Sequence, residues 1–142
     1  MGGELRVRGR NDAGDPWRIA IERPQPRGRL IERMVPIVDL AIATSGDYRN
    51  YYEVDGERIA HILDPRTGRP IRHRLASVTV IDALAVRADA LSTALMVLGP
   101  DDGFALAGQM DLAALFIVRN DAGGFTERAT PRFDAMTKLT GR

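Results

Sequence analysis

The sequence contains no cysteine, which excludes disulfide bonds, thiolate metal sites and cysteine nucleophiles. It also lacks a long apolar run, so it contains no candidate transmembrane helix. Neither sign of charge is in excess, because 20 basic and 19 acidic residues give a net charge of +1, which argues against a nucleic-acid-binding protein. The 142 residues are 44% hydrophobic and 27% charged, a balance typical of one globular domain or part of one.

The first 35 residues differ from the rest of the sequence. Apolar and charged residues alternate over 5–9 and 17–21, on either side of a turn at 11–16, which predicts a hairpin. Residues 22–33 are rich in proline and arginine and are expected to form an exposed loop. The first ten residues contain Glu4 and three arginines and lack the pattern of a signal peptide. A chain that enters a strand from a Gly-Gly pair is expected to be a fragment whose neighbouring segment is missing.

The rest of the sequence predicts short strands interrupted by two helices. Asp55-Gly56 is a strong hairpin signal, and Leu84, Ala88, Leu91, Leu95 and Leu98 recur at helical spacing. The predicted strands are 37–43, 48–54, 58–63, 76–81, 113–118 and 125–128, and the predicted helices are 85–98 and about 101–109. Strands joined by hairpins with two inserted helices indicate an α+β fold with a mostly antiparallel sheet.

The segment Thr44-Ser45-Gly46-Asp47-Tyr48 is the first candidate site. Two hydroxyls before a glycine, at the end of a buried strand, place backbone amides and hydroxyls side by side. Such a turn can hold an anion or the edge of a ligand. An ordinary turn that ends a strand fits the same residues.

The segment from His61 to Gly68 is the second candidate site. On a strand, His61 and Leu63 would share a face, and histidine is the commonest general base near neutral pH. A partly buried structural histidine fits His61 as well. Arg66 and Arg69 are placed to reach a phosphate, whereas His73 lies in a basic stretch and is expected at the surface.

Asp89 and Thr93 form the third candidate site. They are four residues apart, so their side chains lie on one face of the predicted helix. A carboxylate and a hydroxyl are hard oxygen ligands of the kind that magnesium or calcium prefers. In the alternative interpretation, the helix dipole favours Asp89 near the helix start, and Thr93 bonds back to the Asp89 carbonyl.

Taken in order and spacing, these segments resemble one family. They are Ala43–Tyr48, His61–Gly68, Ser77–Val80, Ala88–Leu95 and Val97–Gly99. The chain resembles the C-terminal half of an FAD:protein FMN transferase of the ApbE family, formerly called thiamine-biosynthesis lipoproteins. The resemblance runs from Gly2-Gly3 and Trp17 to about Val118, with residues 35–118 carrying the motifs, so 1–142 is expected to be the C-terminal portion of a flavin transferase domain.

The resemblance implies a reaction. Enzymes of this family use magnesium and FAD to attach FMN through a phosphoester to a threonine of an acceptor protein, and they release AMP. The acceptors are typically subunits of sodium-translocating or electron-transfer complexes. By matching position, Asp89 and Thr93 resemble the metal ligands and Leu63 falls where the family contacts the flavin. Ser45 is assigned to the cofactor-binding set, and His61 is the candidate base for the acceptor threonine.

The sequence also departs from the family. Full members are roughly twice as long, and the half absent here carries most FAD-binding residues. Glu4 stands where the family usually has an aspartate or asparagine after the paired glycines. The isolated chain is therefore expected to bind FAD weakly and to transfer nothing detectable. Many members are envelope lipoproteins, so the resemblance suggests the cell envelope or periplasm, although their anchoring signal lies in the half absent here.

Two other functions remain open from the sequence. One is a non-catalytic flavin-binding or interaction module that pairs with a separate N-terminal polypeptide or with itself. The other is a hydrolase that splits FAD into FMN and AMP when water replaces the threonine. The expected partners are FAD, an acceptor flavoprotein and the missing half of the fold, with no nucleic acid and no membrane segment in this chain.

Overall fold

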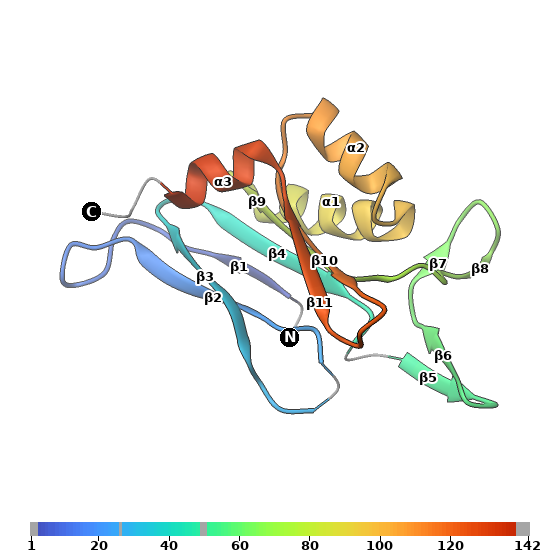
Figure 1. Cartoon of the computed structure of the whole chain (residues 1–142). Helices are drawn as coiled ribbons and strands as arrows, with labels where there is room; N and C mark the ends of the chain where they lie inside the picture. The colour runs from blue at the N-terminus through green and yellow to red at the C-terminus, as the bar shows by residue number, and fades with distance from the viewer. Residues whose placement is uncertain (1–2, 26, 49–50, 139–142) are drawn as a thin grey trace.

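The computed structural model of the chain describes residues 3–25, 27–48 and 51–138. A five-stranded antiparallel sheet forms its centre, in the order β1-β4-β9-β10-β11 (Figure 1). The strands are β1 (Glu4–Arg6), β4 (Ala41–Gly46), β9 (Leu75–Asp82), β10 (Ala113–Arg119) and β11 (Phe125–Ala129). The chain also forms three separate two-stranded hairpins. They pair β2 (Trp17–Glu22) with β3 (Ile31–Ile37), β5 (Tyr51–Val54) with β6 (Glu57–Ala60), and β7 (Leu63–Asp64) with β8 (Arg69–Pro70).

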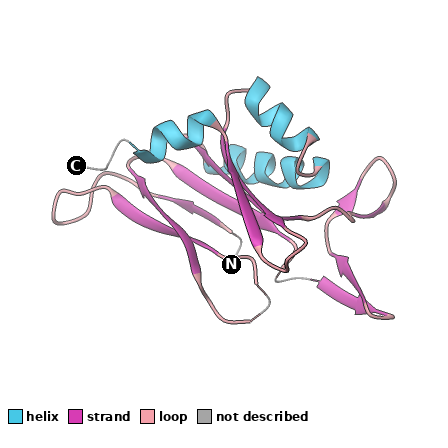
Figure 2. Cartoon of the chain, in the orientation of Figure 1, coloured by secondary structure: helices cyan, strands magenta, loops and turns pink. Residues whose placement is uncertain are grey.

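Both faces of the central sheet are covered. The helices α1 (Ala85–Leu98) and α2 (Asp102–Gln109) cover one face, and α3 (Pro131–Lys138) and the β2–β3 hairpin cover the other (Figure 2). Strand β10 is continuously apolar because both of its faces are buried. Ala114 and Phe116 pack on the side of α1 and α2, whereas Leu115 and Ile117 pack on the side of α3 and the β2–β3 hairpin. The predicted α+β fold with a mostly antiparallel sheet is confirmed.

Local signals in the sequence placed several elements correctly. The predicted helix 85–98 has the same bounds in the structure, and it ends where Gly99 takes a φ of 90°. The two inserted helices are α1 and α2, between β9 and β10. The Asp55-Gly56 pair forms the β5–β6 turn with φ values of 52° and 78°, as a two-residue hairpin turn requires.

The predicted N-terminal hairpin is wrong. Strand β1 pairs with β4, and β2 pairs with β3, so the first two strands do not pair with each other. The exposed loop predicted over 22–33 is shorter than expected, because β3 begins at Ile31. Both errors arise because alternation predicts a strand but not its partner.

The single strand predicted over 37–43 is also wrong. Strand β3 ends at Ile37, and Asp39 turns the chain with a φ of 54° before β4 begins at Ala41. The Asp39 carboxylate accepts a hydrogen bond of 2.8 Å from the Gly9 N–H, which stabilises this turn. Strand β4 then continues to Gly46, so Thr44 and Ser45 belong to the strand that they were expected to end.

The β5–β6 hairpin is shorter than predicted. Its strands cover 51–54 and 57–60, and part of the expected 48–54 strand, residues 49–50, falls outside the described residues. His61 therefore follows the end of β6 and does not share a strand face with Leu63. Helix α3 was not predicted. No helix in the described ranges combines the length and apolar character needed to cross a bilayer.

Candidate functional site

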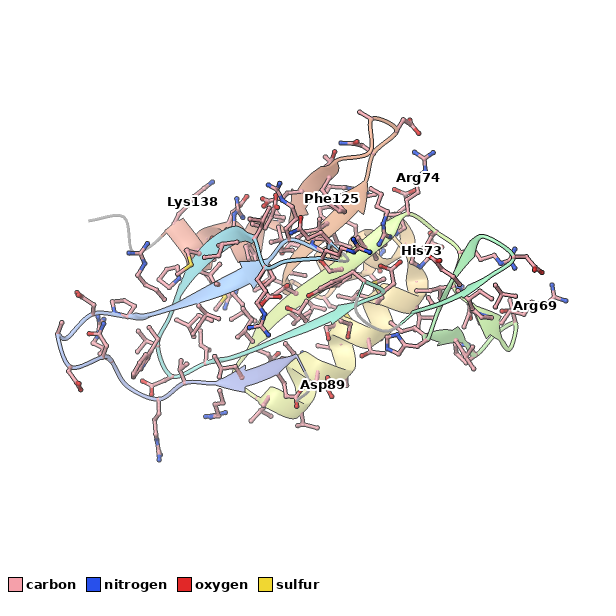
Figure 3. All side chains as sticks on the ribbon, turned by 90° about the horizontal axis from the view of Figure 1, so that it is seen from below. Arg69, His73, Arg74, Asp89, Phe125 and Lys138 are labelled. Carbon is pink, nitrogen blue, oxygen red and sulfur yellow. The ribbon has the colours of Figure 1, made fainter. Side chains whose placement is uncertain are left out.

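A cavity of about 480 Å³ lies at the β1 edge of the central sheet. It collects residues from β1, β2, β4, the segment after β6, and the first turns of α1. The resemblance assigns a catalytic, cofactor-binding or metal-binding role to five residues. Four of them line this cavity: Ser45, His61, Asp89 and Thr93. Figure 3 shows Asp89 on α1 alongside β1. Ser45 and Thr93, which are 48 residues apart, thus converge on one site.

Two glycines shape the wall of this first cavity. A Cβ atom on Gly3 would collide with the carbonyl oxygen of Thr44, whose N–H donates to the Gly3 carbonyl at 3.0 Å. A Cβ atom on Gly46 would lie 2.6 Å from the ring of Tyr48. Glycine at these positions lets β1 approach β4 and lets the Tyr48 ring lie over the end of β4.

A chain of hydroxyl groups joins β4 to α1 at the cavity. Ser92 Oγ donates to the Asp89 carbonyl at 2.9 Å, and a carbonyl can only accept. Each hydroxyl has one hydrogen, so Ser45 must donate to Ser92 (2.9 Å) and Thr93 must donate to Ser45 (2.8 Å). Ser92 therefore makes the bond to the Asp89 carbonyl that the alternative interpretation gave to Thr93. The lone pairs of Thr93 are left for a ligand.

The Asp89 carboxylate suits a cation. Asp89 is exposed to the cavity and forms no ion pair within the part of the chain that the structure describes. Together, Asp89 and the lone pairs of Thr93 offer two hard oxygen donors one helical turn apart. No three His, Asp or Glu side chains among the described residues converge to hold a metal by themselves. The donor set fits magnesium, which completes its shell with water and phosphate oxygens.

His61 and Leu63 occupy different positions relative to this cavity. His61 is exposed and lines the cavity from the segment between β6 and β7. Leu63 is 56% exposed in β7 and does not line it, and Ile62 contributes to the wall instead. The structure thus brings the histidine to the candidate metal ligands and leaves the leucine outside.

Sequence analysis missed the ion pair between Asp47 and Arg119. Arg119 donates two hydrogen bonds to the Asp47 carboxylate, at 2.9 and 2.5 Å, and Asp47 is only 8% exposed. This forked pair fastens the turn after β4 to the end of β10. The two residues are 72 positions apart, so no local pattern connects them.

The arginines expected to reach a phosphate do not line the first cavity. Arg66 instead forms a forked pair with Asp64 across the β7–β8 turn, with its Nη2 2.7 Å from Asp64 Oδ2. Hydrogen bonds from the Arg66 side chain and backbone lower the pKa of Asp64 from its ordinary value. The pair between Asp64 and Arg66 therefore stabilises the folded chain fully at pH values above the ordinary carboxyl pKa. This contribution is lost as the pH falls through the lowered pKa of Asp64.

The expectation that His73 lies at the surface is wrong. Its ring packs against Gly99 at the end of α1, where a Cβ atom would lie 2.9 Å from His73 Cδ2. Its Nδ1 accepts a 3.3 Å hydrogen bond from the Leu75 N–H. The side chain is therefore half-buried between the β8–β9 segment and the end of α1.

Known proteins match almost the whole of this chain in sequence and in fold. The sequence profile of the ApbE family matches residues 1–116. The FAD:protein FMN transferase of Vibrio cholerae serotype O1 is 50% identical over 133 residues, which cover 94% of this chain and 40% of that protein. The chain spans about 40% of the length of the curated relatives it matches.

Two solved structures show the same fold. The Pseudomonas stutzeri flavinyl transferase ApbE in its apo form has a TM-score of 0.80 and 51% sequence identity, covering 96% of this chain and 42% of that one. The ApbE protein from Thermotoga maritima has a TM-score of 0.81 and 37% identity, covering 96% and 43%.

Proposed function

The chain belongs to the ApbE family, and on that basis we propose that it is part of an enzyme that transfers FMN from FAD to a threonine of an acceptor protein. The reaction breaks the pyrophosphate of FAD, joins the FMN phosphorus to the threonine oxygen and releases AMP. The observation that carries this proposal is the convergence of Ser45, His61, Asp89 and Thr93 on one cavity.

Asp89 and Thr93 would hold a magnesium ion. The lining of the first cavity, over the described residues, includes no Arg or Lys, so the side chains here offer no fixed positive charge for a pyrophosphate. The chemistry that such a cation supplies when bound is neutralisation of the charge on the phosphate oxygens. Asp89 contributes a carboxylate oxygen and Thr93 a hydroxyl oxygen whose hydrogen is already donated to Ser45.

His61 is proposed to take the proton of the acceptor threonine. It lines the same cavity as Asp89 and is exposed in this chain. A neutral imidazole can accept this proton as the threonine oxygen attacks phosphorus. Leu63, which projects from β7 outside the cavity, is proposed to contact the flavin in the whole protein.

The remaining part of a full-length protein is proposed to complete the FAD site. The chain supplies part of the proposed FAD site, and it spans about 40% of the length of its relatives. We therefore expect isothermal titration to detect only weak binding of FAD to the isolated chain. Tight, magnesium-dependent binding of FAD to the isolated chain would contradict this division of the site.

The test of the proposed function is analysis of the products. The full-length protein, incubated with FAD and magnesium, is expected to release AMP and to flavinylate an acceptor protein only when that acceptor is present. Equal amounts of free FMN and AMP without acceptor would show an FAD hydrolase instead. Neither product under any condition would favour a non-catalytic flavin-binding module. Chromatography of the nucleotides and in-gel flavin fluorescence separate the three outcomes.

The hydroxyl chain gives a prediction about Ser45. Ser45→Ala removes the acceptor of the Thr93 hydrogen, so Thr93 can turn away and the affinity of the full-length protein for magnesium is expected to fall about tenfold. Ser77→Ala is the matched control, because the buried Ser77 Oγ has no hydrogen-bond partner in the described structure. Magnesium titration that gives the same affinity for Ser45→Ala and the parent would remove Ser45 from this role.

A further inference from the structure

One polar residue lies in the buried stripe of α1, a helix that the structure describes over its whole length. The buried residues of this helix recur at helical spacing, and they are Ala88, Ser92, Leu95 and Met96. The helix packs against β4 and β9. Ser92 is 0% exposed, so its hydroxyl group has no access to water. A buried hydroxyl is unfavourable unless it is hydrogen-bonded, so the partners of Ser92 explain why a serine is tolerated here.

The hydroxyl chain between α1 and β4 runs from this buried position to the first cavity. Ser92 is buried, Ser45 is half-buried and Thr93 is exposed. Ser92 Oγ donates to the Asp89 carbonyl and accepts from Ser45, at 2.9 Å in each case. Water can offer Thr93 another partner, but it cannot reach Ser92. The buried end therefore sets the direction in which all three hydroxyls donate.

The direction of this chain decides what Thr93 can bind. Because the Thr93 hydrogen is donated to Ser45, Thr93 Oγ1 presents only lone pairs to the cavity, which suits a cation. In the opposite direction Ser45 would donate to Thr93, occupy one of these lone pairs and turn the Thr93 hydrogen away from Ser45. A hydrogen on the cavity side opposes the approach of a cation. Ser92 prevents this reversal, because it takes up the Ser45 hydrogen.

We propose that Ser92 is a positioning residue for the metal site and that it acts through Ser45. By accepting the Ser45 hydrogen, Ser92 keeps the Thr93 lone pairs available to the cation. The backbone carbonyl of one proposed ligand, Asp89, thereby orients the hydroxyl of the other, Thr93. This inference rests on the proposed function, because it concerns the metal ligands of the proposed FMN transfer.

The test is a double-mutant cycle on the full-length protein, with Mn²⁺ as the probe. Electron paramagnetic resonance measures free Mn²⁺ and gives the dissociation constant of each variant. Ser92→Ala is expected to weaken Mn²⁺ binding about tenfold, because the Ser45 hydrogen loses its acceptor. In a Ser45→Ala background the same substitution should cause a further loss below about twofold, because the link to Thr93 is already broken. A role of Ser92 in packing alone would give the same loss in both backgrounds.

The matched control is Ser77→Ala. It also removes the hydroxyl of a buried serine, but Ser77 Oγ has no hydrogen-bond partner among the described residues. This variant should bind Mn²⁺ like the parent. Thermal unfolding checks the fold of every variant. If Ser92→Ala does not fold, Ser92→Cys carries the same test, because a thiol of similar size is a weaker donor and acceptor.

Two results would overturn the inference. One is a dissociation constant of Ser92→Ala equal to that of Ser77→Ala, and the other is an equal loss in the parent and Ser45→Ala backgrounds. Asp89→Ala distinguishes these results from a failure of the proposed function, because it should abolish Mn²⁺ binding at this site. If Asp89→Ala binds Mn²⁺ like the parent, the proposed metal site is itself wrong.

Discussion

Replacing Asp89 by alanine in the full-length protein is expected to lower the rate of FMN transfer by about 10³-fold or more. Replacing His61 by alanine is expected to lower it by only about 10²-fold. Both side chains line the first cavity, but the described lining offers no Arg or Lys to compensate for a lost cation. Rates measured at saturating magnesium and FAD, with one acceptor protein, give the comparison.

The physical reason for this order is the nature of phosphoryl transfer. A general base removes only the proton of the attacking oxygen, and it typically contributes about 10²–10⁴-fold. The negative charge lies on the phosphate oxygens, and neutralising it contributes most of the stabilisation. Asp12→Ala, which removes an exposed carboxylate in the turn before β2, is the control and should leave the rate unchanged. A larger loss for His61→Ala than for Asp89→Ala, with magnesium binding intact in the His61 variant, would contradict this account.

Replacing Asp47 by alanine is expected to lower the free energy of unfolding of the chain by about 2 kcal/mol. The variant leaves the Arg119 guanidinium, 27% exposed, without the carboxylate that accepts two of its hydrogen bonds. The figure lies below the range for fully buried pairs because Arg119 keeps some contact with water. Urea denaturation of the isolated chain measures the change.

The matched control for this prediction is Asp121→Ala. Asp121 also pairs with an arginine, Arg74, but its side chain is 85% exposed, so the loss is expected to be under about 0.5 kcal/mol. Equal losses for the two variants would mean that burial does not strengthen the Asp47 pair. If the pair positions the turn after β4, Asp47→Ala should also weaken magnesium binding in the full-length protein.

Local chemistry made part of the fold predictable. The apolar period of 85–98 and Gly99 after it specify α1, and Asp55-Gly56 specifies the β5–β6 turn, because each signal acts within a few residues. Strand partners depend on packing between distant segments. The alternation over residues 5–9 was recognised, but its pairing with β4 required the whole sheet.

The turn at Asp39 shows a signal that was present and missed. Aspartate is one of the few residues other than glycine that adopt a positive φ readily, and Asp39 interrupts an apolar run with a φ of 54°. His73 shows the opposite case. Its basic neighbours indicated the surface, whereas its burial depends on Gly99, which is 26 residues later.

The candidate site was only partly predictable from the residues. The four-residue spacing of Asp89 and Thr93 placed both on one face of α1. Their approach to Ser45 and His61 depends on the pairing of β4 with β9 and on the packing of α1 against both strands. Motif resemblance suggested this grouping, and the structure brings the four residues to one cavity.

The most direct test of the account is a crystal structure of the full-length protein with manganese in place of magnesium and with bound nucleotide. Anomalous scattering should locate a cation bonded to an Asp89 carboxylate oxygen and to Thr93 Oγ1, at about 2.1–2.2 Å from each, with Thr93 still donating to Ser45. A cation bound elsewhere, with Asp89 and Thr93 making no contact to it or to the nucleotide, would contradict the account.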